Sequence, residues 1–246
     1  MPFTFSHPAL IIPLLRARRR WPWLSATGLI AGSVAPDFEK FFRLRLASGN
    51  SHTVASIFYF SCPVGLVLAC VFHLLVRRPL LAHLPAALRA RLRPFENFDW
   101  LSQLRRHPWG AWGSLALGAA LHLVWDSFTH DNGPMMSLLP GLDREVWIGF
   151  RAASLSQLLA LGSSVVGGAI IAGAVWQMPL HPPGPAPSPG ALGRYWGGAA
   201  LIAVALLGQW LLLTRPGVLA ASIAAISASL LGLLVTSVYA GWRGRI

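Results

Sequence analysis

The sequence predicts an all-α, polytopic membrane protein with about five transmembrane helices. Of its 246 residues, 54% are hydrophobic and 11% are charged, and the mean hydropathy is +0.56. Soluble domains usually carry about 25% charged residues. A helix needs about 20 apolar residues to cross a bilayer, and four runs of that length contain no Asp, Glu, Lys or Arg: 54–76, 152–178, 195–214 and 217–239.

A fifth apolar run, 110–128, differs from the other four because it holds His122 and Asp126 near its end. Ionisable side chains inside a membrane are costly and usually functional. We therefore expect function to reside in this run. The last two runs are separated only by Arg215 and Pro216, a tight turn that predicts two antiparallel neighbouring helices.

The segments between the runs indicate the organisation of the chain. Residues 79–107 interleave arginines with leucines, a composition typical of helices that lie in the membrane interface. A proline-rich linker is expected at 179–194. The chain thus divides into a region at 1–150 that carries the polar motifs and C-terminal transmembrane helices at 151–246.

The net charge of +12 comes from 20 basic residues spread over the short polar segments. Anionic lipid headgroups are the expected partners of such charges. The composition excludes a soluble enzyme, a disordered chain and a nucleic-acid-binding domain. The positive-inside rule leaves the orientation open, because alternating sides along the five runs gives ten Arg and Lys on each side.

The same alternation sorts the histidines into two groups at opposite sides of the membrane. A helix rises 1.5 Å per residue, so the two ends of a span cannot share a site. One group, joined by the acids Asp37 and Asp126, consists of His7, His52, His122 and His130. The other group is expected to be interfacial and consists of His73, His83, His107 and His181.

The pattern His122-x-x-x-Asp126-x-x-x-His130 places three potential metal ligands on one helix face. They span about 12 Å over two turns, too far for one ion to bind all three. His122 with Asp126 and Asp126 with His130 each suit one ion, which favours a binuclear site with Asp126 as the bridge. Imidazole and carboxylate ligands suit zinc, manganese or iron, and His7, Asp37 and His52 would complete the ligand set.

Each of these residues also has a plainer interpretation. His122 and Asp126 would serve equally as a hydrogen-bonded pair between helices or as part of a proton relay. The other candidates are common as turn, cap or interface residues: His7, Asp37, His52 and His130. Their placement on a common side of the membrane is what favours a metal site.

Four motifs resemble a known bacterial membrane family, the domain of unknown function 4184. They are MPFTFSHP at 1–8, GSVAPDFE at 32–39, SH at 51–52 and GAALHLVWDSFTH at 118–130. This family is related to the YdjM-like membrane-bound metal-dependent hydrolases. It is more distantly similar to zinc-dependent phospholipase C and the S1-type nucleases. The motifs cover about residues 1–150.

The resemblance implies a phospholipase C-like, metal-binding helical bundle in the N-terminal half. It implies that His52, His122 and Asp126 ligate one ion, and that Asp37 lies beside the attacking water as base or ligand. It further implies that His7 and His130 complete a second ion. No His-x-x-x-Glu pair follows His130, so a trinuclear centre is not expected.

Two functional hypotheses result. The first is a hydrolase of the bacterial inner membrane, in which a divalent metal, zinc before manganese or iron, activates water to attack a phosphoester or a lipid-linked ester at the interface. Arg43 and Arg45 would attract the phosphate. The alternative is a non-catalytic metal-binding scaffold, or a small transporter or proton relay. The two differ in whether His7, Asp37 and His52 converge on the face of His122 and Asp126.

Overall fold

The computed structural model describes residues 3–17, 20–46, 49–129, 135, 138–149, 151–182, 184 and 186–243. The chain divides into two compact units. The first comprises Met1–Asp37, Gly49–Leu66 and Arg106–Trp176, and the second comprises Phe38–Ser48, Val67–Arg105 and Gln177–Ile246.

The first unit is built mainly of helices and contains one small sheet. Its elements are η1 (Thr4–Ile11), α1 (Ile12–Ala17), α2 (Ala26–Val34), η2 (Ala35–Asp37), the π-helix η3 (Ile57–Ser61), the start of α4 (Cys62–Val71), α8 (Pro108–Asp126), η6 (Pro140–Asp143), β1 (Glu145–Ile148), β2 (Arg151–Ser154) and α10 (Leu155–Trp176).

The second unit is helical throughout its described residues. Its elements are α3 (Phe38–Arg43), the end of α4, the π-helix η4 (Phe72–Val76), α5 (Arg77–Ala82), α6 (Ala86–Leu92), η5 (Arg93–Phe95), α7 (Trp100–Arg106), α11 (Pro189–Thr214) and α12 (Val218–Arg243). The last residue of α7, Arg106, already belongs to the first unit. The short helices α6 and α7 fall in the segment predicted to lie in the interface, and α5 overlaps the start of that segment.

Four helices in the described part of the chain are long and apolar enough to cross a membrane: Ile57–Ala82, Leu155–Trp176, Pro189–Thr214 and Val218–Arg243. They indicate an integral membrane protein and correspond to the four uncharged runs. The fifth run does form a helix, α8, but it is not among these four. Its glycines, His122 and Asp126 lower its hydropathy, and its buried residues pack inside the first unit.

Helices α2 and α8 form the centre of the first unit through direct backbone contact. A Cβ atom on Gly32 would lie 2.1 Å from the Leu115 carbonyl oxygen, and one on Gly118 would lie 2.3 Å from that of Leu29. Only glycine permits so close an approach of two helices. Ser25 caps α2 by accepting a hydrogen bond from the Gly28 amide, and its own amide donates to Ser114 Oγ on α8 at 2.8 Å.

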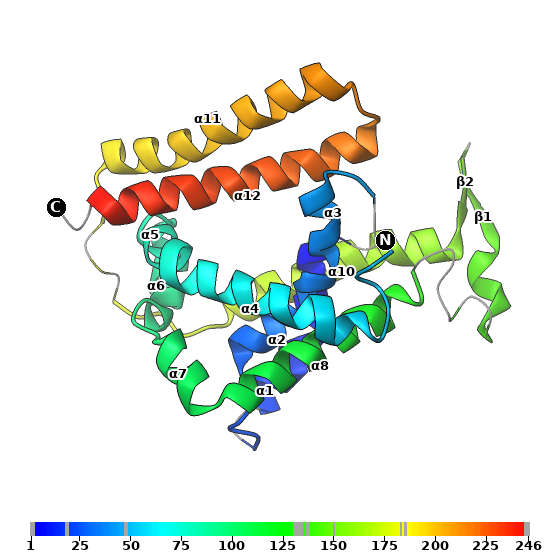
Figure 1. Ribbon diagram of the computed structural model, residues 1–246, viewed down its shortest axis with the longest axis horizontal. Helices are drawn as coiled ribbons and strands as arrows, with labels where there is room; N and C mark the ends of the chain where they lie inside the picture. The colour runs from blue at the N-terminus through cyan, green and yellow to red at the C-terminus, as the bar shows by residue number, and fades with distance from the viewer. Residues whose placement is uncertain are drawn as a thin grey trace. The chain divides into compact units, whose positions relative to one another are not determined.

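In the second unit, α11 and α12 form the antiparallel pair that the tight turn predicts (Figure 1). Arg215 ends α11 in the left-handed conformation, with φ of 44°. A Cβ on Gly232 would lie 2.4 Å from the Ala199 carbonyl oxygen, so these helices also touch through their backbones. Helix α11 begins at Pro189, inside the range predicted as a linker, because the Ser188 side chain caps it.

The two-stranded sheet of β1 and β2 departs from the all-α prediction. The strands pair antiparallel, with Val146 opposite Ala153, and Gly149 follows β1 with φ of +60°. Val-Trp-Ile before a glycine is a β-hairpin signal. The predicted transmembrane run at 152–178 includes part of β2, so α10 begins three residues later than that run.

Candidate metal centre

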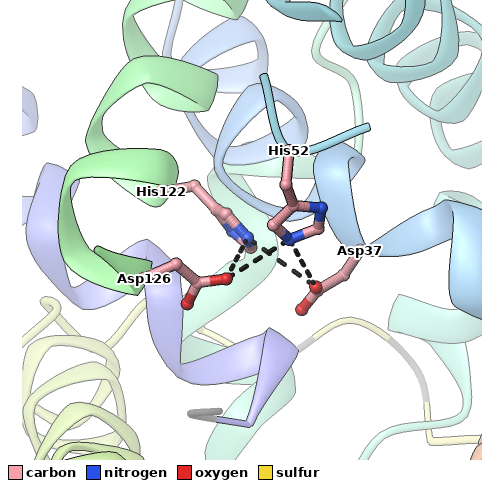
Figure 2. A group of neighbouring side chains, drawn as sticks. All are labelled: Asp37, His52, His122 and Asp126. Carbon is pink, nitrogen blue, oxygen red and sulfur yellow. Dashed lines mark ion pairs between the residues drawn. The ribbon is translucent and has the colours of Figure 1, made fainter. Parts of the chain in front are cut away.

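Four side chains in the first unit converge on one point: Asp37, His52, His122 and Asp126 (Figure 2). Each offers one ligand atom, and these atoms all lie within 4.8 Å of one another. The convergence confirms the coarse prediction of a His and Asp cluster that could hold a metal. It also confirms that Asp37 and His52, from separate segments, reach the face of α8 that carries His122 and Asp126.

The local structure explains how three segments supply these groups. His122 and Asp126 are four residues apart on α8, so their side chains share one face at its C-terminal end. Asp37 ends the short turn η2 that follows α2, and α2 is fixed against α8 by the glycine contacts. His52 precedes η3 in a loop, where Ser56 Oγ donates a hydrogen bond to the Ser51 carbonyl.

Four of the six distances between the ligand atoms are close to those of a tetrahedral ligand set, and all six are within 4.8 Å. His122 Nε2 lies 3.3 Å from Asp126 Oδ2 and 3.7 Å from Asp37 Oδ1. His52 Nε2 lies 3.3 Å from Asp126 Oδ2 and 3.5 Å from Asp37 Oδ1. Four donors placed tetrahedrally around zinc at about 2.0–2.1 Å are about 3.3–3.4 Å apart, so one ion fits among these atoms with small adjustments.

The ring nitrogens of His122 have the arrangement found in metal-ligating histidines. Nδ1 lies 2.8 Å from the Ser33 carbonyl oxygen, which only accepts hydrogen bonds, so the proton is on Nδ1 and the lone pair is on Nε2. Among the described residues, the buried Nε2 makes no hydrogen bond of acceptable geometry. A cation at the centre would satisfy this atom.

The protonation states of the α8 ligands also suit a cation. Burial lowers the pKa of His122 by more than the neighbouring carboxylates raise it, which keeps the imidazole neutral. Burial alone would raise the pKa of Asp126, but its close contacts with the rings of His122, His52 and His7 lower the pKa overall. Neutral imidazole and ionised carboxylate are the forms that bind metals.

The outer oxygens of the two carboxylates contact η1. Thr4 Oγ1 donates a hydrogen bond to Asp37 Oδ2 at 2.5 Å, and His7 Nε2 lies 3.2 Å from Asp126 Oδ1. The His7 ring also stacks on that of His122 at 3.9 Å. The sequence pointed to His7 but not to Thr4, because a hydroxyl near the start of a chain carries no signal of its own.

Access to the centre is uneven. The His52 side chain is 14% exposed, whereas those of Asp37 and His122 are fully buried and that of Asp126 is 5% exposed. The cluster is therefore most exposed to solvent on the side of His52.

The sequence also predicts His130, Arg43 and Arg45 as site residues. His130 lies outside the described residues. Arg43 and Arg45 belong to the second unit, and Arg43 Nε pairs with Glu39 at 3.1 Å. Of the histidines predicted to be interfacial, His73 stacks on Trp100 and His83 stacks on Tyr195, all within the second unit.

Comparison with known proteins identifies the family. The model of the family described as Domain of unknown function (DUF4184) matches residues 1–241, so the chain belongs to that family. The match extends through the C-terminal helices, beyond the motifs at 1–150. No curated protein and no solved structure matches the chain.

Proposed function

We propose that this DUF4184 protein is a membrane-bound, metal-dependent hydrolase that cleaves a phosphoester or a lipid-linked ester at the membrane interface. The observation that carries the proposal is the convergence of Asp37, His52, His122 and Asp126 within 4.8 Å. Such a ligand set suits zinc, with manganese and iron as the other candidates. The relation of the family to the YdjM-like hydrolases is part of this proposal.

Catalytic zinc sites usually have three protein ligands and one open position, whereas structural sites have four ligands. We assign His52, His122 and Asp126 as the ligands, and place Asp37 beside the open position. When bound, a divalent ion supplies Lewis acidity and makes water nucleophilic near neutral pH. Asp37 Oδ1 would orient that water and accept its proton, while Thr4 holds the other oxygen of this carboxylate.

The position of the centre supports a substrate at the membrane surface. His52 stands five residues before Ile57, where the first candidate membrane helix begins, and it is the most exposed of the four side chains. The first unit also contains α10, a second candidate membrane helix. A headgroup or a lipid-linked ester could therefore reach the centre without leaving the bilayer surface. The bacterial inner membrane is the proposed location.

A non-catalytic metal scaffold is the second candidate, because a complete set of four ligands would leave no open position. The full burial of Asp37 favours it. A proton relay has less support. Between His122 and the start of α8, the polar side chain available is Ser114, and its hydroxyl already donates to the Gly110 carbonyl and accepts from the Ser25 amide.

The metal is tested by elemental analysis of the detergent-purified full chain, prepared without chelators. We expect bound metal in the native protein and its loss in Asp126→Ala and His52→Ala. His181→Ala is the matched control, because this exposed histidine lies in the second unit. Absence of metal in the native protein, or full retention in Asp126→Ala, would overturn the proposal.

Asp37→Asn separates the hydrolase from the scaffold. We expect this variant to retain its metal, bound more weakly because the charge of the carboxylate is lost, and to hydrolyse substrate about 10²- to 10⁴-fold more slowly, the range of general-base contributions. The probes are bis(p-nitrophenyl) phosphate, p-nitrophenyl phosphate, and vesicles of phosphatidylethanolamine and phosphatidylglycerol. Loss of metal in Asp37→Asn, together with no turnover by the native protein, would favour the scaffold.

The stoichiometry tests the binuclear site that the sequence favours. A second ion would need His7 and His130 beside Asp126. Both ring nitrogens of His7 face oxygen acceptors, the Thr4 carbonyl at 3.2 Å and Asp126 Oδ1. We therefore propose one ion at the four-residue centre, and a measured ratio of two ions per chain would restore the binuclear arrangement.

A further inference from the structure

The segment η1 lies between the ligand carboxylates and the membrane helix α10. On one side, Thr4 and His7 contact the oxygens of Asp37 and Asp126 that face away from the ligand cluster. Both η1 side chains are buried, with 6% and 2% of their surface exposed. Each carboxylate thus has one oxygen directed to the cluster and the other directed to η1.

On its other side, η1 is fixed to α10 by two contacts. The Phe3 amide donates a hydrogen bond to Ser164 Oγ at 2.8 Å, and Ser164 Oγ in turn donates to the Ala160 carbonyl. One turn further along α10, a Cβ on Gly167 would lie 2.9 Å from both Cβ and the carbonyl oxygen of Ser6. Gly167 therefore permits backbone contact at this point.

We propose that α10 sets the geometry of the metal centre through η1, with Thr4 as the positioning residue for Asp37. The proposal rests on the metal centre described above and assigns Thr4 no contact with the ion. The Asp37 carboxylate is fully buried, and its hydrogen bond from Thr4 fixes the rotation that points Oδ1 at His52 and His122. His7 does the same for Asp126, so one short segment orients both carboxylates.

This arrangement makes the membrane helix a part of the site. Ser164 and Gly167 carry no ligand atom, yet they determine where Thr4 and His7 stand. Removing a hydrogen-bond partner of a metal ligand typically weakens metal binding by about 10- to 100-fold. A displaced η1 would remove such a partner from the ligand Asp126 and, at the same time, the hydrogen bond that orients Asp37.

The first test compares Thr4→Val with Thr4→Ser. Valine keeps the shape of threonine but cannot donate to Asp37, whereas serine keeps the hydroxyl. Zinc affinity of the full chain in detergent is measured by competition with a chromogenic chelator, and thermal unfolding of the metal-free protein is recorded beside it. We expect zinc binding in Thr4→Val to be weaker by up to about 10-fold, the lower end of the range for partners of metal ligands, because the charge of Asp37 Oδ1 is no longer held towards the ion. We expect near-native binding in Thr4→Ser.

Two results would count against the role of Thr4. Equal zinc affinity in Thr4→Val and the native protein would overturn the inference and leave the proposed function intact. Equally weakened zinc binding in Thr4→Val and Thr4→Ser would show that the Thr4 hydroxyl does not account for the effect, which also overturns the inference. A native protein that binds no zinc would overturn the proposed function and this inference together.

The second test uses two neighbouring glycines of α10. Gly167→Leu places a side chain against the Ser6 backbone, whereas Gly168 has nothing within 4 Å of an added Cβ, which makes Gly168→Leu the matched control. We expect weaker zinc binding in Gly167→Leu and native binding in Gly168→Leu. Native zinc affinity in a folded Gly167→Leu would overturn the link to α10. If Gly167→Leu does not fold, Gly167→Ala replaces it. The alanine Cβ alone would already lie 2.9 Å from Cβ and from the carbonyl oxygen of Ser6.

Discussion

The contact between α2 and α8 gives a sharp prediction for Gly118. A Cβ at this position would lie 2.3 Å from the Leu29 carbonyl oxygen and 2.8 Å from the Ser33 amide nitrogen. Ordinary van der Waals contact begins at 3.4 Å, so Gly118→Ala must move the helices apart by about 1.1 Å, the difference between 3.4 and 2.3 Å. Both neighbours are backbone atoms, which cannot rotate away.

Overpacking of this kind typically lowers the free energy of unfolding by about 1–3 kcal/mol. The higher helix propensity of alanine relative to glycine offsets about 1 kcal/mol of that loss. The shift also changes the metal centre. Gly118 stands one turn before His122, and the Ser33 carbonyl holds His122 Nδ1 at 2.8 Å. We therefore expect Gly118→Ala to lower the free energy of unfolding and to weaken zinc binding together.

Gly113→Ala on the same helix is the control. The nearest atom to its added Cβ belongs to the Trp23 side chain, 3.9 Å away. Because no clash is added, only the higher helix propensity of alanine should act, and Gly113→Ala should be slightly stabilised. The stability of both variants is measured by thermal unfolding in detergent, and their zinc affinity by chelator competition. The reasoning is refuted if Gly118→Ala unfolds at the same temperature as Gly113→Ala and binds zinc equally well.

Three further predictions concern single side chains. His7→Gln should leave one ion per chain at lower affinity in elemental analysis and chelator competition; a fall from two ions to one would instead identify His7 as a ligand. Ser114→Ala should reduce the free energy of unfolding by about 1–3 kcal/mol, because the buried Ser25 amide loses its acceptor; an unchanged unfolding temperature would contradict this. Arg43→Gln should change stability by less than about 1 kcal/mol, because the side chain is 42% exposed in its pair with Glu39. The same variant should leave KM for the phosphodiester probe unchanged, and a raised KM would show that Arg43 contacts substrate.

The parts of the structure that the sequence predicts are those set by local spacing. The four uncharged runs became membrane-length helices, and the spacing of His122 and Asp126 placed both on one face of α8. The convergence of Asp37 and His52 on that face is expected from their common side of the membrane and from the family resemblance, since nothing in their own neighbours specifies it. Thr4 was missed because its role comes from a contact 33 residues away in sequence.

Two departures have local physical causes. The sequence groups α8 with the membrane runs because it is apolar along most of its length, but its glycines pack against α2, and His122 and Asp126 belong to the His and Asp cluster. The run predicted at 152–178 takes in the end of β2, because Ala152 and Ala153 are apolar in either structure. In both cases apolar composition alone did not distinguish burial in protein from exposure to lipid.

The arrangement of the ligands implies that metal binding and helix packing stabilise each other. Two proposed ligands stand on α8, Asp37 follows α2, and η1, which is hydrogen-bonded to α10, contacts both carboxylates. An ion that binds this folded arrangement and not the unfolded chain adds RT ln(1 + [M]/Kd) to stability, about 2.7 kcal/mol at 100 times Kd. By the same linkage, any change that separates α2 from α8, or η1 from α10, must reduce the affinity for the ion. The glycines at these contacts are therefore as much a part of the centre as its ligands, although none of them touches the ion.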